Sequence, residues 1–285
     1  GLRKVQEIQP DKIFILDKPM VSKEFLEYTR QHNLPVIWID HHPVQNPENV
    51  YYYNPLNGKK PSGVPTSYIC WKTVKKDEWL AMIGCIADWH MPEFAKEFSE
   101  EYPALLEKVG RPEDALFTSQ LGKIVFMLGH GMRDTTTNVM KMIKALIEVQ
   151  DPNEILSPNR NLEPMVERYE SLTKIYQKIL KKALAASQDG KIIFYRYSGD
   201  MALSRNLCNE LFYLNKRKKI VLVAKINGDR AQICMTGPED KDLRVIVAKA
   251  LETISGTGGG HKQAVGSSIN EADLDKFKEI VESYA

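Results

Sequence analysis

The sequence predicts an α/β protein in which a parallel-sheet domain is joined by helices to a smaller α/β domain with a mixed sheet. Three observations support this fold class. In the first third of the chain, short apolar runs alternate with segments of helical periodicity, as in parallel strands covered by helices. The middle of the chain is helical, and the last third returns to strands that include a hairpin. A length of 285 residues also favours two domains over a single core. We expect the first domain over residues 1–130, a helical linker over 131–188 and the second domain over 189–285.

The first domain is predicted from two strands and the helices around them. Lys12–Asp17 and Pro35–Asp40 are continuous apolar runs that each end in an aspartate, which suits buried parallel strands. Ser22 can cap the helix that lies between them. Residues 54–65 are rich in Pro, Gly, Lys and Asn and predict a loop. Further helices are expected over Leu2–Gln9, Thr66–Val74 and Glu78–Ala87.

The middle of the chain carries apolar residues at intervals of three and four, which predicts helices. These helices are expected over Leu121–Leu128, Thr136–Val149 and 162–183. The last of them is followed by Gln188-Asp-Gly190. It is interpreted either as a strut between two domains or as an ordinary packed helix.

The second domain is predicted from strands that surround an Asn227-Gly228 turn, a sequence that favours a type I′ hairpin. We expect strands over Lys191–Tyr195, Lys219–Ala224, Ala231–Met235 and Ala264–Ile269. We expect helices over Ser204–Leu214, Leu243–Thr253 and Glu271–Tyr284.

The composition is that of an ordinary globular chain, with 43% hydrophobic and 27% charged residues, which excludes collagen-like and wholly disordered classes. The net charge of +2 selects no class of partner. No apolar run reaches the roughly 18 residues of a membrane helix, and the start of the chain lacks the apolar core of a signal peptide. The cysteines are scattered without a C-x-x-C pair, which indicates reduced thiols. We therefore expect a cytoplasmic protein that does not enter a membrane.

Acidic and histidine side chains stand where a metal site can form. Asp40-His41-His42 follows one predicted strand, Asp17 ends the strand before it, and Asp88 ends a predicted apolar helix. Ligands bind at the carboxyl ends of strands in open α/β sheets. Carboxylates together with imidazoles suit a divalent cation, and the absence of thiolates favours Mn²⁺ over a zinc-finger site. Each residue alone is more often a cap, a loop acceptor or a surface residue.

A second set of residues suggests anion binding in the last third of the chain. Gly256–His261 contains three consecutive glycines, which allow backbone conformations closed to other residues and expose amide N–H groups that can cradle an anion. His261 and Lys262 add hydrogen-bonding capacity and charge. The alternative is a flexible turn. Arg205 and Asn206 open a predicted helix and could also meet a phosphate.

Together the two motifs resemble the DHH phosphoesterase family. Its members pair a catalytic domain that contains Asp-His-His with a DHH-associated domain that contains Gly-Gly-Gly-His. The motifs here are Asp40-His41-His42 and Gly258-Gly259-Gly260-His261. Asp17 and Asp88, the latter in Gly84-Cys-Ile-Ala-Asp88, match the family's other acidic motifs. The resemblance spans almost the whole chain.

The resemblance implies two-metal hydrolysis of a phosphodiester, with Mn²⁺ as the expected ion and Mg²⁺ as the alternative. Asp17, His41 and Asp88 would be the metal ligands, with Asp17 bridging two ions in a complete site. Asp40 would orient its neighbours, and His42 would face the substrate phosphate. The implied catalytic residues are Asp17, Asp40, His41, His42 and Asp88. The implied substrate-binding residues are His42, Arg205, Asn206, Gly258, Gly259, Gly260 and His261.

The sequence departs from the family pattern in two places. The family's first motif, Asp-x-Asp after a strand, should precede Asp17, where sixteen residues hold only Glu7 and Asp11 as acids. The family often has an arginine in the strand after the hairpin, where Met235-Thr236 stands here. We therefore expect one tight metal position and impaired hydrolysis.

The expected substrates are short single-stranded RNA or DNA, or a related nucleotide phosphate. The main alternative is a catalytically inactive family member that serves as a scaffold or nucleic-acid-binding partner. An inorganic pyrophosphatase shares the metal motifs, but the Gly-Gly-Gly-His segment argues against it. Whether the chain forms a homodimer is left open.

Overall fold

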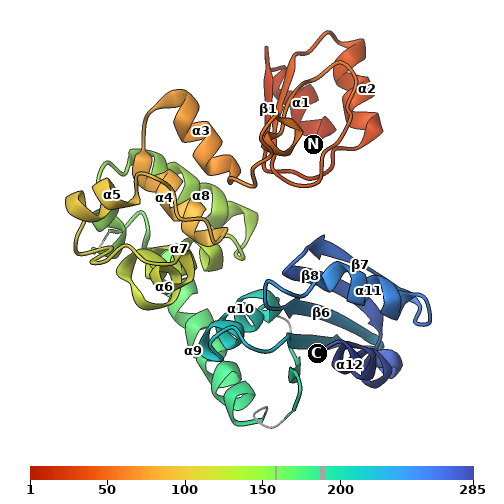
Figure 1. Ribbon diagram of the computed structural model, residues 1–285. Coiled ribbons are helices and arrows are strands. Elements are labelled where there is room, and N and C mark those ends of the chain that lie inside the picture. Colours follow the sequence, from red (N-terminus) through yellow and green to blue (C-terminus); the bar gives the residue numbers. More distant parts are fainter. Residues whose placement is uncertain (158, 187–189, 200) are drawn as a thin grey trace. The chain divides into compact units, whose positions relative to one another are not determined.

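The computed structural model describes residues 1–157, 159–186, 190–199 and 201–285, and it confirms the predicted fold class (Figure 1). The chain forms two compact units, Gly1–Val166 and Glu167–Ala285. The first contains a three-stranded sheet and the second a five-stranded sheet. The division into a first domain, a linker and a second domain with the boundaries given above stays a prediction. No helix in the described parts of the chain combines the length and apolar character needed to cross a membrane.

The sheet of the first unit is parallel, in the order β1-β2-β3. β1 (Ile13–Leu16) and β2 (Val36–Ile39) occupy the two predicted apolar runs, and α2 (Lys23–Gln31) joins them. The Ser22 hydroxyl caps α2 by accepting from the Phe25 amide, as predicted. Because β1 and β2 run in register, the residues that follow them lie at the same edge of the sheet.

β3 (Tyr51–Tyr53) was not predicted from the sequence. Its tyrosines alternate between exposed and half-buried, and the segment lacks the apolar run that identified the other two strands. It pairs with β2 from Ile37↔Tyr51 to Ile39↔Tyr53. The short helix α1 (Leu2–Ile8) precedes β1 and buries none of its residues.

β1 lies at the edge of this sheet and exposes apolar side chains. Phe14 is 60% exposed and Leu16 is 50% exposed, whereas Val36 and Trp38 of the neighbouring β2 are buried. The apolar content that identified β1 therefore does not correspond to a strand covered on both faces.

Helices form the core of the rest of the first unit. They are α3 (Thr66–Val74), α4 (Glu78–Ala87), α5 (Ala95–Glu101), α6 (Pro112–Thr118), α7 (Gln120–Gly131) and α8 (Thr136–Glu148). On α4, Met82 and Ile86 are fully buried, and on α7 Leu121 and Ile124 are fully buried. α4 packs against α7. Asp88 directly follows α4 as its C-cap, so this apolar contact fixes its position.

The second unit holds a mixed sheet in the order β4-β5-β6-β8-β7. Only β4 and β5 pair in parallel, and the other neighbours are antiparallel. Its strands are β4 (Ile193–Ser198), β5 (Val221–Asn227), β6 (Arg230–Thr236), β7 (Gly256–His261) and β8 (Ala264–Asn270). Its helices are α10 (Ser204–Leu214), α11 (Leu243–Leu251) and α12 (Leu274–Ser283), and α9 (Glu163–Ala186) precedes them. Gly228 has φ +60° in the β5–β6 turn, as the predicted hairpin requires. Of the predicted turn after α9, Gln188 and Asp189 lie outside the described residues.

The two faces of this sheet are covered differently. Leu222 and Ala224 of β5 belong to a core that also contains Leu243 of α11 and Phe277 of α12. On the opposite face, α10 packs on β5 and β6, and the Cys208 thiol donates to the carbonyl of Val221. Figure 1 shows α10 apart from α11 and α12 around this sheet.

The alternative interpretation of Gly256–His261 as a flexible turn is wrong, because this segment is the edge strand β7 and pairs with β8 along its whole length. At Gly258, packing explains the glycine. A Cβ at Gly258 would lie 2.6 Å from the Ser267 hydroxyl oxygen and 2.6 Å from a methyl group of Val247 on α11. The glycine thus lets α11 approach the strand closely.

Two glycines of α7 provide a test of the packing of this helix against α6. A Cβ at Gly122 would lie 1.9 Å from the Leu116 carbonyl oxygen, whereas a Cβ at Gly129 would meet nothing within 4 Å. We expect Gly122→Ala to lower the free energy of unfolding by about 1–3 kcal/mol, because the helix must move away from its neighbour. Gly129→Ala should raise it by roughly 0.5–1 kcal/mol. Urea denaturation measures both, and equal effects of the two substitutions would contradict this packing.

Candidate active site

The sheet of the first unit brings two aspartates to one edge. The amide of Asp17 donates to the Ile39 carbonyl (3.0 Å), and the amide of Asp40 donates to the Tyr53 carbonyl (3.1 Å), so the backbone ladder continues into both residues. Asp17 has φ 56°, in the left-handed region that few non-glycine residues adopt. The chain therefore turns sharply at the end of β1, at the residue that carries the carboxylate.

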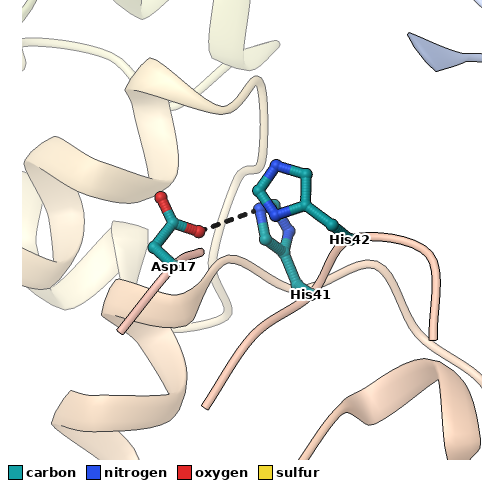
Figure 2. A group of neighbouring side chains, drawn as sticks. All are labelled: Asp17, His41 and His42. Carbon is teal, nitrogen blue, oxygen red and sulfur yellow. Dashed lines mark ion pairs between the residues drawn. The ribbon is translucent and has the colours of Figure 1, made fainter. Parts of the chain in front are cut away.

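The imidazole of His41 lies between two carboxylates from separate segments, and Figure 2 shows it beside the first of them, Asp17. His41 Nε2 is 3.3 Å from Asp17 Oδ1 and 3.4 Å from Asp88 Oδ2. The His41 side chain is 11% exposed, and those of Asp17 and Asp88 are 57% and 44% exposed. The three segments thus meet, as the sequence prediction requires. Both carboxylates remain open to solvent.

Asp40 holds the second histidine. Its fully buried carboxylate accepts a hydrogen bond from the His42 backbone amide (3.1 Å) and contacts His42 Nδ1 at 2.8 Å. When the neutral His42 ring carries its proton on Nδ1, its free lone pair is on Nε2. Asp40 therefore orients His42 rather than reaching the cluster itself.

Two further residues support the site and were not predicted as site residues. Thr66, the first residue of α3, donates from its hydroxyl to Asp17 Oδ1 (3.1 Å). Asn54 donates to the His42 carbonyl (2.8 Å) and to the Tyr52 hydroxyl (2.9 Å). Thr66 is recognised in the sequence only as a helix start, and Asn54 only as part of a polar loop.

The charges in this cluster stabilise one another. The hydrogen bond from His41 holds the pKa of Asp17 below its ordinary value, with smaller contributions from the charge of His41 and the Thr66 hydroxyl, while burial opposes the shift. The hydrogen bond to Asp17 raises the pKa of His41, and the charges of Asp88, Asp17 and Asp40 add to this against the effect of burial. When it is protonated, the His41 ring therefore faces two carboxylates.

The donor set fits one divalent cation. Ligand atoms of Asp17, His41 and His42 all lie within 4.8 Å of one another, and this is the only such His/Cys/Asp/Glu group among the residues that the structure describes. Asp88 adds a second carboxylate beside His41. Carboxylates with imidazole and no thiolate suit Mn²⁺ or a similar ion. Because ligands must be deprotonated, binding an ion here requires the neutral form of His41.

A cleft of about 490 Å³ opens beside the cluster within the first unit. Asp17 and Asp88 lie on its wall, and the side chains of Leu16, Trp71 and Leu80 make part of it apolar. The candidate ligands therefore border a space that can take a small molecule with both charged and apolar parts.

The predicted substrate-binding residues of the second unit lie on α10 and β7. Arg205 and Asn206 belong to the first turn of α10, and Arg205 is exposed. On β7, Gly258 faces α11, whereas Gly259 and His261 lie on the other side of the strand. Arg205 is near enough to Cys234 of β6 to lower the pKa of its thiol, which burial raises more strongly.

Both units are similar to known proteins. Residues 188–285 match the DHHA1 domain family. RecJ from Thermus thermophilus in complex with Mn²⁺ has a TM-score of 0.68 and 19% identity, and the match covers 100% of this chain and 46% of that one. The DHH domain of a member of the s1p family of ribosomal proteins has a TM-score of 0.65 and 15% identity, over 99% of this chain and 72% of that one. No curated protein sequence matches.

A third structural relative is a pGpG-specific phosphodiesterase from Vibrio cholerae, with a TM-score of 0.50 and 12% identity over 90% of this chain and 87% of that one. The Thermus RecJ is also known in complex with Mg²⁺. These likenesses, with the DHHA1 match, confirm the resemblance to the DHH family, with a RecJ-like fold. The chain spans about half the length of the Thermus RecJ that it matches.

The ion pairs of His41 predict a pH dependence in the metal-free protein. Because the pKa of His41 is raised, its contribution to stability is present below its unfolded value of about 6.5 and is lost as the pH rises through the folded pKa. Because the pKa of Asp17 is lowered, its contribution is present above about 3.9 and is lost as the pH falls through the folded pKa.

We expect an NMR titration of the metal-free protein to show that Asp17→Asn lowers the pKa of His41. An unchanged His41 titration in the variant would show that the two side chains do not interact.

Proposed function

We propose that this chain, with its DHHA1 domain and RecJ-like fold, is a metal-dependent phosphodiesterase that acts on short oligonucleotides or related nucleotide phosphates. The observation that carries the proposal is the meeting of Asp17, His41 and Asp88 at one sheet edge beside a cleft. A purely structural cluster would not need two half-exposed carboxylates on one imidazole.

In this proposal Asp17, His41 and Asp88 hold the ion. When bound, a divalent ion supplies charge stabilisation to a phosphoryl group and makes water a better nucleophile. His42, oriented by the buried Asp40, presents Nε2 to the substrate and donates a hydrogen bond to a phosphate oxygen when protonated.

Mn²⁺ is the proposed ion and Mg²⁺ the alternative. The mixed carboxylate and imidazole donors favour Mn²⁺ on chemical grounds. The relative from Thermus thermophilus binds each of the two ions in its structures, which supports a site that accepts either.

We propose that the chain binds one ion tightly and hydrolyses slowly. Two-metal hydrolysis needs a second set of ligands, with the ions about 3.5–4 Å apart. The described residues form a single candidate group, so Asp17 has the ligands of only one ion beside it. The same observation favours the alternative function, an inactive scaffold or nucleic-acid-binding protein.

A short substrate is proposed because the cleft beside the cluster is small and because a relative of similar extent is described as specific for pGpG. We also propose a cytoplasmic location, since the scattered cysteines are all free thiols.

Metal titration distinguishes the enzyme from the scaffold. We expect calorimetry with Mn²⁺ to give one tight site per chain and His41→Ala to abolish it, because the imidazole is shared by both carboxylates. Glu24→Gln, a substitution of an exposed acid on α2, should leave binding unchanged. No tight site, or a site that survives His41→Ala, would contradict the proposal.

Cleavage of a labelled pentanucleotide in Mn²⁺ tests the proposed chemistry. Slow metal-dependent release of mononucleotides or shorter oligonucleotides is expected, with Asp88→Asn inactive. Asp40→Asn should lower activity or metal affinity about 10–100-fold, because residues that orient a site typically have effects of that size. Cleavage that persists in EDTA or in Asp88→Asn would place the reaction elsewhere.

A further inference from the structure

The exposed side of α9 carries its charges in two blocks. α9 (Glu163–Ala186) is the longest helix that the structure describes (Figure 1). One side of it is buried, at residues that include Leu172 and Tyr176. With 3.6 residues per turn, a stripe of exposed charged residues lies on the opposite side, and all of its acids precede all of its bases. We call these residues the α9 stripe: Glu163, Glu167, Glu170, Lys174, Lys178 and Lys181.

This order of charges does not stabilise the helix itself. Glu163 and Glu167 are four residues apart, as are Lys174 and Lys178, and like charges at that spacing destabilise a helix. Glu170 and Lys174 are the one pair of opposite charges in the stripe at that spacing. The helix dipole acts only near the helix ends, where Glu163 lies in the first turn and the last turn holds no basic residue. The dipole therefore accounts for Glu163 alone.

The stripe is not neutralised within the chain. None of its six side chains has an ion-pair or hydrogen-bond partner among the residues that the structure describes. The whole chain has a net charge of only +2, so the separation into an acidic and a basic block does not follow from an overall excess of one sign. Six exposed charges thus remain available to another molecule.

The stripe is complementary to itself when two copies of α9 lie antiparallel. Each glutamate of one copy then faces a lysine of the other, because the acidic and basic positions lie symmetrically about Leu172. A two-fold axis forms every pair twice, as in the self-complementary interfaces of homodimers. In a parallel arrangement, glutamates would face glutamates. The three antiparallel pairs are Glu163 with Lys181, Glu167 with Lys178 and Glu170 with Lys174.

A second copy of this chain fits the stripe better than a polyanion does. The stripe is about 27 Å long, at 1.5 Å per residue. A nucleic acid along it would be attracted by the basic block and repelled by the acidic block. An acidic protein surface would meet the same conflict. A partner with the reverse order of charges matches both blocks, and an antiparallel copy supplies that order.

We propose that this chain forms a homodimer in which the α9 stripes of two copies pair antiparallel about a two-fold axis at Leu172. The interface depends on exposed ion pairs, which contribute little individually and are screened by salt. The dimer is therefore reversible and forms best at low ionic strength. It needs neither metal nor substrate, so it stands or fails apart from the proposed function.

Sedimentation velocity of the full chain in EDTA tests this proposal. At a protein concentration of about 100 µM and about 20 mM salt, we expect a species with the mass of two chains. Raising the salt to about 500 mM shortens the range of electrostatic interactions to a few ångströms. The dimer should then be at least about tenfold weaker. A protein that is monomeric at low salt would overturn the proposal.

Charge reversal identifies the surface. A first variant makes the stripe wholly acidic and should be monomeric at low salt, because two such stripes repel each other. A second variant makes it wholly basic and should be monomeric for the same reason. An equimolar mixture of the two should form a heterodimer. The first variant carries Lys174→Glu, Lys178→Glu and Lys181→Glu, and the second carries Glu163→Lys, Glu167→Lys and Glu170→Lys.

A matched control changes the net charge as much as the first variant but leaves α9 intact. It carries Lys59→Glu, Lys60→Glu and Lys108→Glu, all at exposed positions outside this helix. The control should dimerise like the unaltered protein. Melting temperatures show whether each variant folds. If a triple variant is unstable, Lys178→Glu alone should still weaken the dimer at least about fivefold, because its partner Glu167 meets it twice.

The outcomes decide the proposal in either direction. Loss of the dimer in both stripe variants and its return in their mixture support antiparallel pairing of α9. A dimer that survives either reversal uses another surface, and a mixture that stays monomeric shows that the two blocks do not pair. Dissociation of the control would show that net charge, and not the stripe, governs association. Each of these last three results overturns the proposal and leaves the proposed hydrolysis untouched.

Discussion

The contact of one imidazole with two carboxylates is the interaction on which the candidate site depends. Asp17 and Asp88 carry like charges, and the ring of His41 between them compensates both, either as a protonated imidazole or beside a bound cation. Three local features bring the groups together: a left-handed turn after β1, a strand end at Asp40 and the C-cap of α4. Each feature belongs to a different part of the first unit, so the site forms only when the whole unit is folded.

The candidate ligands all belong to the first unit. Asp17, His41 and His42 supply oxygen and nitrogen atoms that suit a divalent cation, and Asp88 adds a second carboxylate beside His41. The match to the DHHA1 domain family lies in the second unit, over residues 188–285, and the chain shares its fold with RecJ.

Sequence reasoning succeeded where the signal is local. The apolar runs at β1 and β2, the helices α3 and α4 and the β5–β6 hairpin follow from neighbouring residues. Sequence reasoning failed where contacts between residues far apart in the chain determine the structure. Gly256–His261 is a strand because β8 pairs with it, although its glycines locally favour a loop. Thr66 supports Asp17 from 49 residues away, and no pattern in the sequence links the two. The motif residues could be identified as a group, but the distances between them required the register of the first sheet.

The most direct test of the central claim is anomalous diffraction from crystals soaked in Mn²⁺. The account predicts one strong anomalous peak bonded to Asp17, His41 and Asp88 together. A peak that is bonded to other residues, or no peak at this sheet edge at saturating metal, would contradict it.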